Sequence, residues 1–298
     1  MRVVVAGSHG LIGSALVEHL RGRGDEVVRL VRGSASLPDE RTWDPDRGVL
    51  DPQALTGAHA VVNVTGVNAG SRPLTPARKR AVVQSRLRTT ALLARTLAND
   101  PSPRVLLQAS GIGAYGDRGD EELTEAEPLG STFFAELVRR WEAATAPAAA
   151  AGVRVVHLRS GVVLAPRGGA LGRLLPLIRL GLGGPLGSGR QFWSWITLHD
   201  EVRAIAHLLD APVRGPVNLV ATSARNEEVV AALARAYGRP ARLRVPAFAL
   251  RIALGDFSQE ILGSVRAVPA ALTASGFVHH HRDVETAAAW VREQSARR

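Results

Sequence analysis

The stretch Gly7-Ser8-His9-Gly10-Leu11-Ile12-Gly13 decides the fold of this chain. It follows a β-branched run at Arg2–Ala6 and precedes an amphipathic segment at 11–21, so it predicts a turn from a strand into a helix. The first glycine permits the turn, the second lets the backbone approach a phosphate, and the third lets the helix pack on the strand. Because the helix start offers unpaired N–H groups and a positive dipole, we expect this stretch to bind a dinucleotide. A tight turn without a ligand is the alternative.

Short β-branched runs alternate with helical segments as far as residue 165. The expected strands are Arg2–Ala6, Glu26–Val31, 58–64, 104–109 and 153–158, and the expected helices are 11–21, Pro76–Asn99 and 131–151. Such alternation is typical of βαβ units. We therefore predict an α/β fold in which residues 1–165 form a Rossmann domain, a doubly wound parallel sheet with helices on both faces.

The composition changes after residue 165. Residues 166–190 are rich in Gly, Pro and Arg and lead to the aromatic residues Phe192, Trp193 and Trp195, so we expect them to line or cover a site. Further on, the pattern predicts a helix at 199–209, a strand at 216–220, a helix at 226–237 with Asn226 as N-cap, and mostly helical structure over 245–298. Residues 166–298 are thus expected to form a substrate or lid region and a smaller, mostly helical C-terminal domain, with some segments returning to the Rossmann core.

The end of the second expected strand bears on which dinucleotide binds. A site that prefers NAD(H) usually has a carboxylate there to hold the ribose hydroxyls, and this chain has none. Arg32 and Ser34 could instead contact a 2′-phosphate, because a guanidinium offers a planar, charged fork to phosphate oxygens. We therefore expect NADP(H) to be favoured, with NAD(H) possible. A surface role for Arg32 is the alternative.

Composition limits the possible partners. The net charge of +10 would suit a nucleic acid, but the 37 basic residues are scattered and all except Lys79 are arginine, which indicates a bias of the genome. Their densest run, at residues 78–88, lies on an expected helix and would form a solvated face. No signal segment or membrane-spanning run stands out, so we expect a cytoplasmic monomer or homodimer without a nucleic-acid or membrane partner. The absence of cysteine excludes disulfides and thiolate sites.

Several stretches together resemble a known family. They are Gly7–Gly13, 61–66, 78–86, 114–120, 158–164, and 187–191 with 194–196. The chain resembles the extended short-chain dehydrogenase/reductase superfamily over essentially its whole length. Within it, the chain is similar to the SulA-like branch of the NAD-dependent epimerase/dehydratase family. Its last part, with Val245-Pro246 and Val268-Pro269, looks like the small domain of unknown function that closes this branch.

The resemblance implies roles for residues at strand ends. Thr65 and Gly66 would lie along the cofactor, Ser110 beside the nicotinamide, and Arg159, Gly161 and Val162 near the cofactor and substrate cleft. Ordinary turn chemistry at the strand ends is the alternative. The carboxyl ends of parallel strands are where such folds bind ligands, which favours the ligand roles.

The catalytic pair of the superfamily, Tyr-x-x-x-Lys, is missing. In that pair the lysine lowers the pKa of the tyrosine so that the phenol can transfer a proton. Neither Tyr115 nor Tyr237 is followed by a lysine at the fourth position. Aligning Glu142 with the glutamate that often follows the pair places Phe134 and Val138 at its two positions. The serine of the superfamily is replaced as well, by Gly111.

Two functions from different classes remain open. The first is an atypical NADP-dependent oxidoreductase or epimerase acting on an unidentified small molecule. In it, Ser110 would donate a hydrogen bond, Tyr115 would donate a proton and Arg190 would clamp an anionic group beside Trp193 and Trp195. The second is a dinucleotide-binding sensor or regulator without catalysis, for example in cell division. It gains support because an unpaired tyrosine has a pKa near 10 and is a slow acid or base.

Other chemistries are disfavoured. Consecutive residues of a strand point to alternating faces, so His279-His280-His281 would surround a metal ion poorly, and we expect no metal site. Asp200 is expected at a helix start, without a chemical role. The chain has no Gly-x-Ser-x-Gly elbow, which argues against a serine hydrolase.

Overall fold

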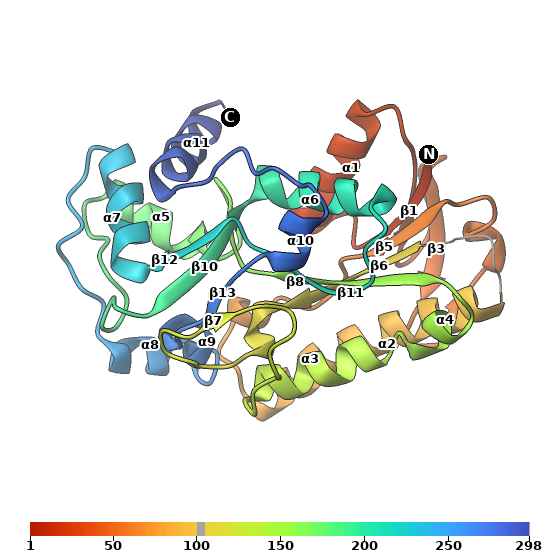
Figure 1. Cartoon of the computed structure of the whole chain (residues 1–298), viewed down its shortest axis with the longest axis horizontal. Coiled ribbons are helices and arrows are strands. Elements are labelled where there is room, and N and C mark those ends of the chain that lie inside the picture. The colour runs from red at the N-terminus through yellow and green to blue at the C-terminus, as the bar shows by residue number, and fades with distance from the viewer. Residues whose placement is uncertain (100–104, 298) are drawn as a thin grey trace.

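The computed structural model describes residues 1–99 and 105–297 (Figure 1). Its large sheet has the strand order β11-β8-β6-β5-β1-β2-β3-β4, and all neighbours are parallel except β3 and β4. The strands are β1 (Arg2–Ala6), β2 (Glu26–Val31), β3 (Glu40–Asp44), β4 (Val49–Leu50), β5 (Ala60–Asn63), β6 (Val105–Gly111), β8 (Arg154–Ser160) and β11 (Gly215–Leu219). This is the predicted doubly wound sheet.

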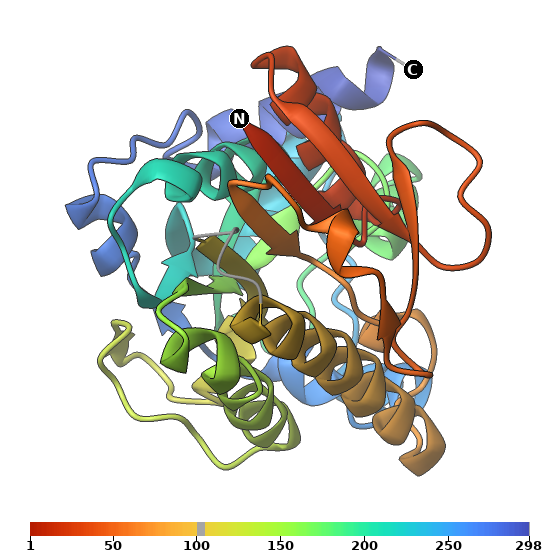
Figure 2. The same ribbon diagram turned by 90° about the vertical axis from the view of Figure 1, so that its right-hand side faces the viewer.

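Helices cover both faces of the large sheet (Figure 2). On one face, α1 (Leu11–Gly22), α6 (Leu198–Asp210) and α10 (Ala270–Ala274) pack in one hydrophobic core with Val3 and Val5. On the other, α2 (Pro76–Asn99) and α4 (Ala146–Ala150) share a core with Val4, and α3 (Phe133–Ala143) lies beside α2. Successive β1 side chains thus face opposite cores, as the period of a strand requires.

A second lobe adjoins the carboxyl ends of these strands (Figure 1). Its three-stranded sheet joins β9 (Val162–Leu164), β10 (Phe192–Thr197) and β12 (Thr222–Arg225), with α5 (Leu171–Arg179), α7 (Asn226–Ala236) and α11 (Val284–Ala296) in the same core. A further pair, β7 (Glu122–Leu123) with β13 (Arg266–Ala267), and the helices α8 (Ala247–Leu254) and α9 (Ser258–Leu262) complete it. Although they follow residue 165, β11, α6 and α10 lie with the large sheet.

The helix predicted over 131–151 is divided. It ends at Ala143 and restarts at Ala146, because Pro147 has no N–H and its ring would clash with the preceding turn of a continuous helix. Proline is tolerated in the first turn, which is where α4 has it.

The start of α7 also differs from its prediction. Arg225 is the N-cap, and Asn226 is the first helical residue. The Asn226 side chain is buried instead, and its Oδ1 accepts the N–H of Leu186 at 2.8 Å.

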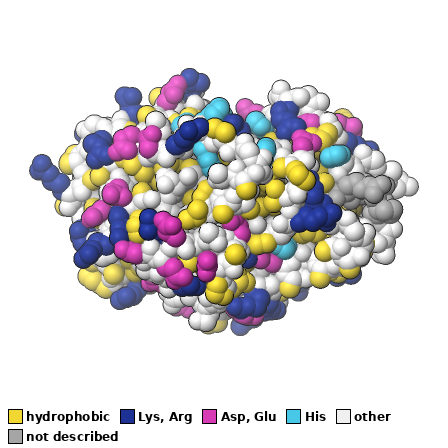
Figure 3. All heavy atoms as spheres, in the orientation of Figure 1, with side chains coloured by type: hydrophobic (Ala, Val, Ile, Leu, Met, Phe, Trp, Pro, Cys, Tyr) yellow, Lys and Arg dark blue, Asp and Glu magenta, His cyan; other side chains and the backbone are white. Residues whose placement is uncertain are grey.

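Of the other predictions, residue 104, at the start of an expected strand, lies outside the described residues. Within the described parts of the chain, no helix combines the length and apolar character needed to cross a bilayer. Basic and acidic side chains are interspersed on the face that Figure 3 shows.

Candidate functional site

The glycine loop between β1 and α1 is tightly packed. Gly7 has a φ of +90°, which side chains rarely adopt, and a Cβ atom there would lie 2.9 Å from the carbonyl carbon of Val64. A Cβ atom on Gly13 would overlap the carbonyl oxygen of Gly7. Gly10 is the N-cap of α1, and its N–H donates to the same oxygen at 3.0 Å. Packing therefore requires glycine at the first and third positions of the motif.

The start of α1 is open to ligands. No side chain in the described parts of the chain caps it, and its first turn contains no acidic residue. A hollow of about 360 Å³ lies in front of the loop, bounded by the end of β2 and by Val64, Thr65 and Gly66. The N–H groups of the first turn can therefore bind an anion, as the sequence predicts.

Arg32 lies between this hollow and a neighbouring one of about 450 Å³. Arg47, which the sequence analysis did not single out, lines the second hollow together with Asp44. The Asp44 Oδ1 accepts the N–H of Arg47 at 3.1 Å and so fixes the turn after β3. Neither guanidinium has a partner among the residues that the structure describes. Ser34, predicted to accompany Arg32, is exposed and lines neither hollow.

A cleft of about 610 Å³ runs between the strand ends and the second lobe. The predicted site residues that line it are Gly10, Leu11, Ile12, Gly13, Gly66, Ser110, Gly161, Val162 and Trp193. Phe134 and Val138 line it too, so the positions aligned with the catalytic pair face the cleft with apolar side chains. Thr65 lies at the hollow in front of the loop, where its Oγ1 is 2.6 Å from Oδ1 of Asn63.

Ser110 connects the cleft to a buried polar network. Its hydroxyl donates to Oε1 of Glu142 at 2.7 Å, and Arg159 donates to both oxygens of this carboxylate at 2.9 Å. Burial alone would raise the pKa of Glu142, but the hydrogen bonds and charge of Arg159 outweigh it and hold this pKa below its ordinary value. Glu142 is therefore ionised at neutral pH and orients the Ser110 hydroxyl.

Tyr115 belongs to the same network and not to the cleft wall. Its side chain is 0% exposed, and its hydroxyl donates to Oδ1 of Asn218 at 2.8 Å and accepts from Arg159 at 3.0 Å. Burial raises the pKa of the phenol above its ordinary value. The structure thus contradicts the predicted role of Tyr115 as a proton donor. Arg159, expected near the cofactor, is buried behind Ser110, where Glu142 holds it.

Two of the three predicted substrate residues also lie away from the cleft. Trp195 is 0% exposed and packs in the core of the second lobe. Arg190 is exposed on the turn before β10, and its carbonyl oxygen accepts a hydrogen bond from Arg225. Only Trp193 lines the cleft, with its indole N–H donating to the carbonyl oxygen of Ile261 at 3.2 Å. The sequence analysis did not predict β10, so it could not separate these positions.

Arg86 is the basic residue that lines the cleft. Far from the expected solvated face, it lies 4.9 Å from the ring centre of Trp141, and its Nη1 donates to the carbonyl oxygens of Val67 and Val82. Burial lowers its pKa to about 10, so it remains a cation at neutral pH. No carboxylate in the described ranges pairs with it, which leaves a positive charge for an anionic ligand.

A histidine cluster forms elsewhere, differently from the expected strand. Ligand atoms of His199, Asp200 and His280 lie within 4.8 Å of one another. They already bond protein groups: Nε2 of His199 is 3.0 Å from Nδ1 of His280, and the Asp200 carboxylate accepts the N–H groups of His280 and His281 at 3.0 and 2.9 Å. Asp200 lies in the first turn of α6, as predicted, and ties the segment before α11 to it.

Comparisons with known proteins cover nearly the whole chain. Residues 3–222 match the model of the NAD dependent epimerase/dehydratase family, and residues 245–291 match DUF1731, a domain of unknown function. Epimerase family protein Mb2239 of Mycobacterium bovis is 44% identical over 285 residues, which cover 95% of this chain and 94% of that protein. The crystal structure of human epimerase family protein SDR39U1 (isoform 2) with NADPH superposes with a TM-score of 0.89 at 34% identity, over 98% of this chain and 99% of the human one.

Proposed function

The chain belongs to the NAD dependent epimerase/dehydratase family, and from this premise we propose that it is an oxidoreductase or epimerase that uses NADP(H) on a small molecule. The observation that carries the proposal is the uncapped start of α1, open to a hollow that two unpaired guanidinium groups border. The NADPH in the crystal structure of the human relative supports the choice of cofactor.

The residues fit this cofactor in two separate places. The glycine loop and the first turn of α1 would hold the pyrophosphate, and Arg32 and Arg47 would hold the 2′-phosphate. The cleft beyond Gly66 would take the nicotinamide ribose and ring beside Ser110. When bound, the nicotinamide exchanges a hydride with a carbon atom of the substrate.

The substrate end of the cleft favours a molecule with an anionic group and an apolar part. Arg86 offers the charge, in place of Arg190, while Phe134, Val138 and Trp193 form apolar walls. The Ser110 hydroxyl can accept a hydrogen bond from a substrate hydroxyl while it donates its own proton to Glu142.

The experiment is a titration of the purified protein with NADPH and with NADH, for the wild type and for Arg32→Ala and Arg47→Ala. Each variant removes a charge-assisted hydrogen bond worth about 1.5–3 kcal/mol, so NADPH affinity should fall at least about tenfold while NADH affinity stays the same. Arg95→Ala is the matched control, since Arg95 is exposed on α2 away from both hollows. Tighter binding of NADH than of NADPH by the wild type would refute the cofactor assignment.

A dinucleotide sensor without catalysis is the second candidate. The apolar residues Phe134 and Val138 at the cleft wall favour it, because neither can transfer a proton. Tight NADPH binding with no turnover of carbonyl compounds or nucleotide sugars would select the sensor over the enzyme.

A further inference from the structure

The inference concerns the acid or base that the cleft would need, and it rests on the proposed function. Among the described residues that line the cleft, only Arg86 and Glu260 carry ionisable side chains. Arg86 stays protonated near neutral pH, so it does not exchange protons there. Tyr115 is enclosed, and the Ser110 hydroxyl donates its proton to Glu142. Glu260 is left.

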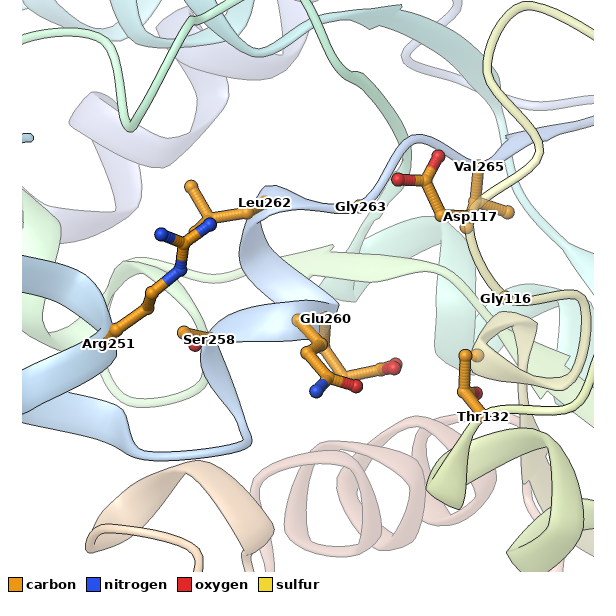
Figure 4. Close-up of a pocket in the computed structure, with 11 residues that line it drawn as sticks. Gly116, Asp117, Thr132, Arg251, Ser258, Glu260, Leu262, Gly263 and Val265 are labelled. Carbon is orange, nitrogen blue, oxygen red and sulfur yellow. The ribbon is translucent and has the colours of Figure 1, made fainter. Parts of the chain in front are cut away.

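Glu260 comes from α9, in the segment that matches the domain of unknown function. It lines the cleft and also an adjoining pocket of about 360 Å³ that Arg251, Asp117 and Thr132 border (Figure 4). In Figure 4 its side chain points into this pocket, toward Gly116 and Thr132. The carboxyl group thus stands where the cofactor cleft meets a second, more polar space that could receive a substrate.

The fold makes room for this carboxyl group. A Cβ atom on Gly113, at the end of β6, would overlap Oε2 of Glu260 and would lie 3.3 Å from Cβ of Phe134. Oε2 is therefore close to Phe134, at the place in the cleft where a proton donor is missing. The ring of Phe257 packs edge-on against Phe134 at 5.8 Å and anchors the start of α9.

The Glu260 carboxyl group has no hydrogen-bond or ionic partner in the part of the chain that the structure describes. A structural carboxylate in such surroundings would normally be paired, because an unpaired buried charge is costly. Burial raises the pKa of Glu260 to about 7, where both protonation states are populated at neutral pH.

We propose that Glu260 is the general acid and base of the reaction, in place of the missing tyrosine. In carbonyl reduction a hydride reaches the carbonyl carbon, the C=O π electrons move to the oxygen, and the Glu260 carboxyl group gives its proton to that oxygen. The products are an alcohol, an oxidised nicotinamide and the Glu260 carboxylate, which then takes a proton from water. In the reverse direction the carboxylate removes the hydroxyl proton.

The kinetic test follows NADPH oxidation with 4-nitrobenzaldehyde and 9,10-phenanthrenequinone as carbonyl probes, for the wild type, Glu260→Gln and Glu260→Asp. Glu260→Gln keeps the shape but cannot donate a proton, so kcat should fall about 10²- to 10⁴-fold, the usual contribution of a general acid, with little change in NADPH affinity. The inflection near pH 7 in the profile of kcat/KM should disappear, and Glu260→Asp should restore part of the rate. Glu18→Gln, an exposed site on α1, is the matched control.

A second measurement needs neither substrate nor cofactor. The carbon-13 NMR signal that wild-type protein with labelled glutamate shows and Glu260→Gln lacks should titrate near pH 7. A pKa below about 5.5 for this signal, or a Glu260→Gln enzyme with unchanged kcat and pH profile, would overturn the proposal. So would NADPH binding by the wild type without oxidation by either probe. Failure to bind NADPH at all would instead defeat the proposed function, while the NMR titration would still decide the proton exchange of Glu260.

Discussion

Glu201 is a second carboxyl group with an unusual environment, beneath the cleft. It is fully buried on α6, its Oε1 accepts the Ser160 hydroxyl at 2.6 Å, and its Oε2 has no partner in the described structure. Burial raises its pKa to about 7, although the bond from Ser160 acts in the opposite direction. Glu201 is therefore largely protonated at and below neutral pH.

This environment predicts how stability depends on pH. Between the ordinary pKa of 4.5 and about 7, the folded protein keeps a proton on Glu201 that the unfolded chain has lost. The contribution of this proton is complete below pH 4.5 and is lost as the pH rises through 7, with a slope of about 1.4 kcal/mol per pH unit. Urea unfolding from pH 5 to 8 should show a shallower decline for Glu201→Gln than for the wild type. Equal slopes for both proteins would contradict this, and Glu18→Gln should retain the wild-type slope.

Some site residues are visible in the sequence because a local rule marks them. The glycine loop is one, since turn, approach and packing each demand glycine at a fixed spacing. Arg47 and Glu260 carry no such mark, because β3 and α9 bring them to the site from distant parts of the chain. Tyr115 misled the analysis, because a tyrosine at a strand end suits a buried hydrogen bond to Asn218 as well as chemistry.

At the scale of elements, the strand-to-helix turn makes a sharp prediction. Gly13→Ala would put a methyl group onto the carbonyl oxygen of Gly7, so α1 must move away from β1. We expect a loss of stability of about 1–3 kcal/mol, as for overpacked cores, and weaker NADPH binding in the same variant. Both are measured by urea unfolding and by titration.

Gly22→Ala is the control in the same helix. A Cβ atom there would meet nothing within 4 Å, so this change should be neutral or stabilising by up to about 1 kcal/mol. A Gly13→Ala protein as stable as Gly22→Ala would show that the turn tolerates a side chain.

The elements of the first half were predictable because their patterns are strong. Arg2–Ala6, Glu26–Val31 and Pro76–Asn99 have the bounds that the sequence predicts, since buried parallel strands are continuous apolar runs and α2 is long. The short strands β7, β9 and β13 were not predicted, because two or three residues carry no periodicity and form only by pairing with a partner.

At the scale of the whole molecule, the cleft has one wall from each lobe. Residues of α1 line one side, and Phe257, Glu260 and Val265 line the other. Bound NADPH should therefore slow amide hydrogen exchange both at the start of α1 and over residues 257–265, because it stabilises the closed arrangement of both walls. Exchange measured with and without NADPH tests this. Protection confined to α1 would mean that the second lobe does not close on the cofactor.

The path of the chain between the lobes has a practical consequence. After β9 and β10 in the second lobe, the chain returns through α6 and β11 to the large sheet, leaves again for β12 and α7, and visits the sheet once more as α10 before ending in α11. A gene cut once between β9 and α11 would leave each polypeptide with pieces of both hydrophobic cores. Neither half could be produced as an independent module, and a split version would work only as two complementing fragments.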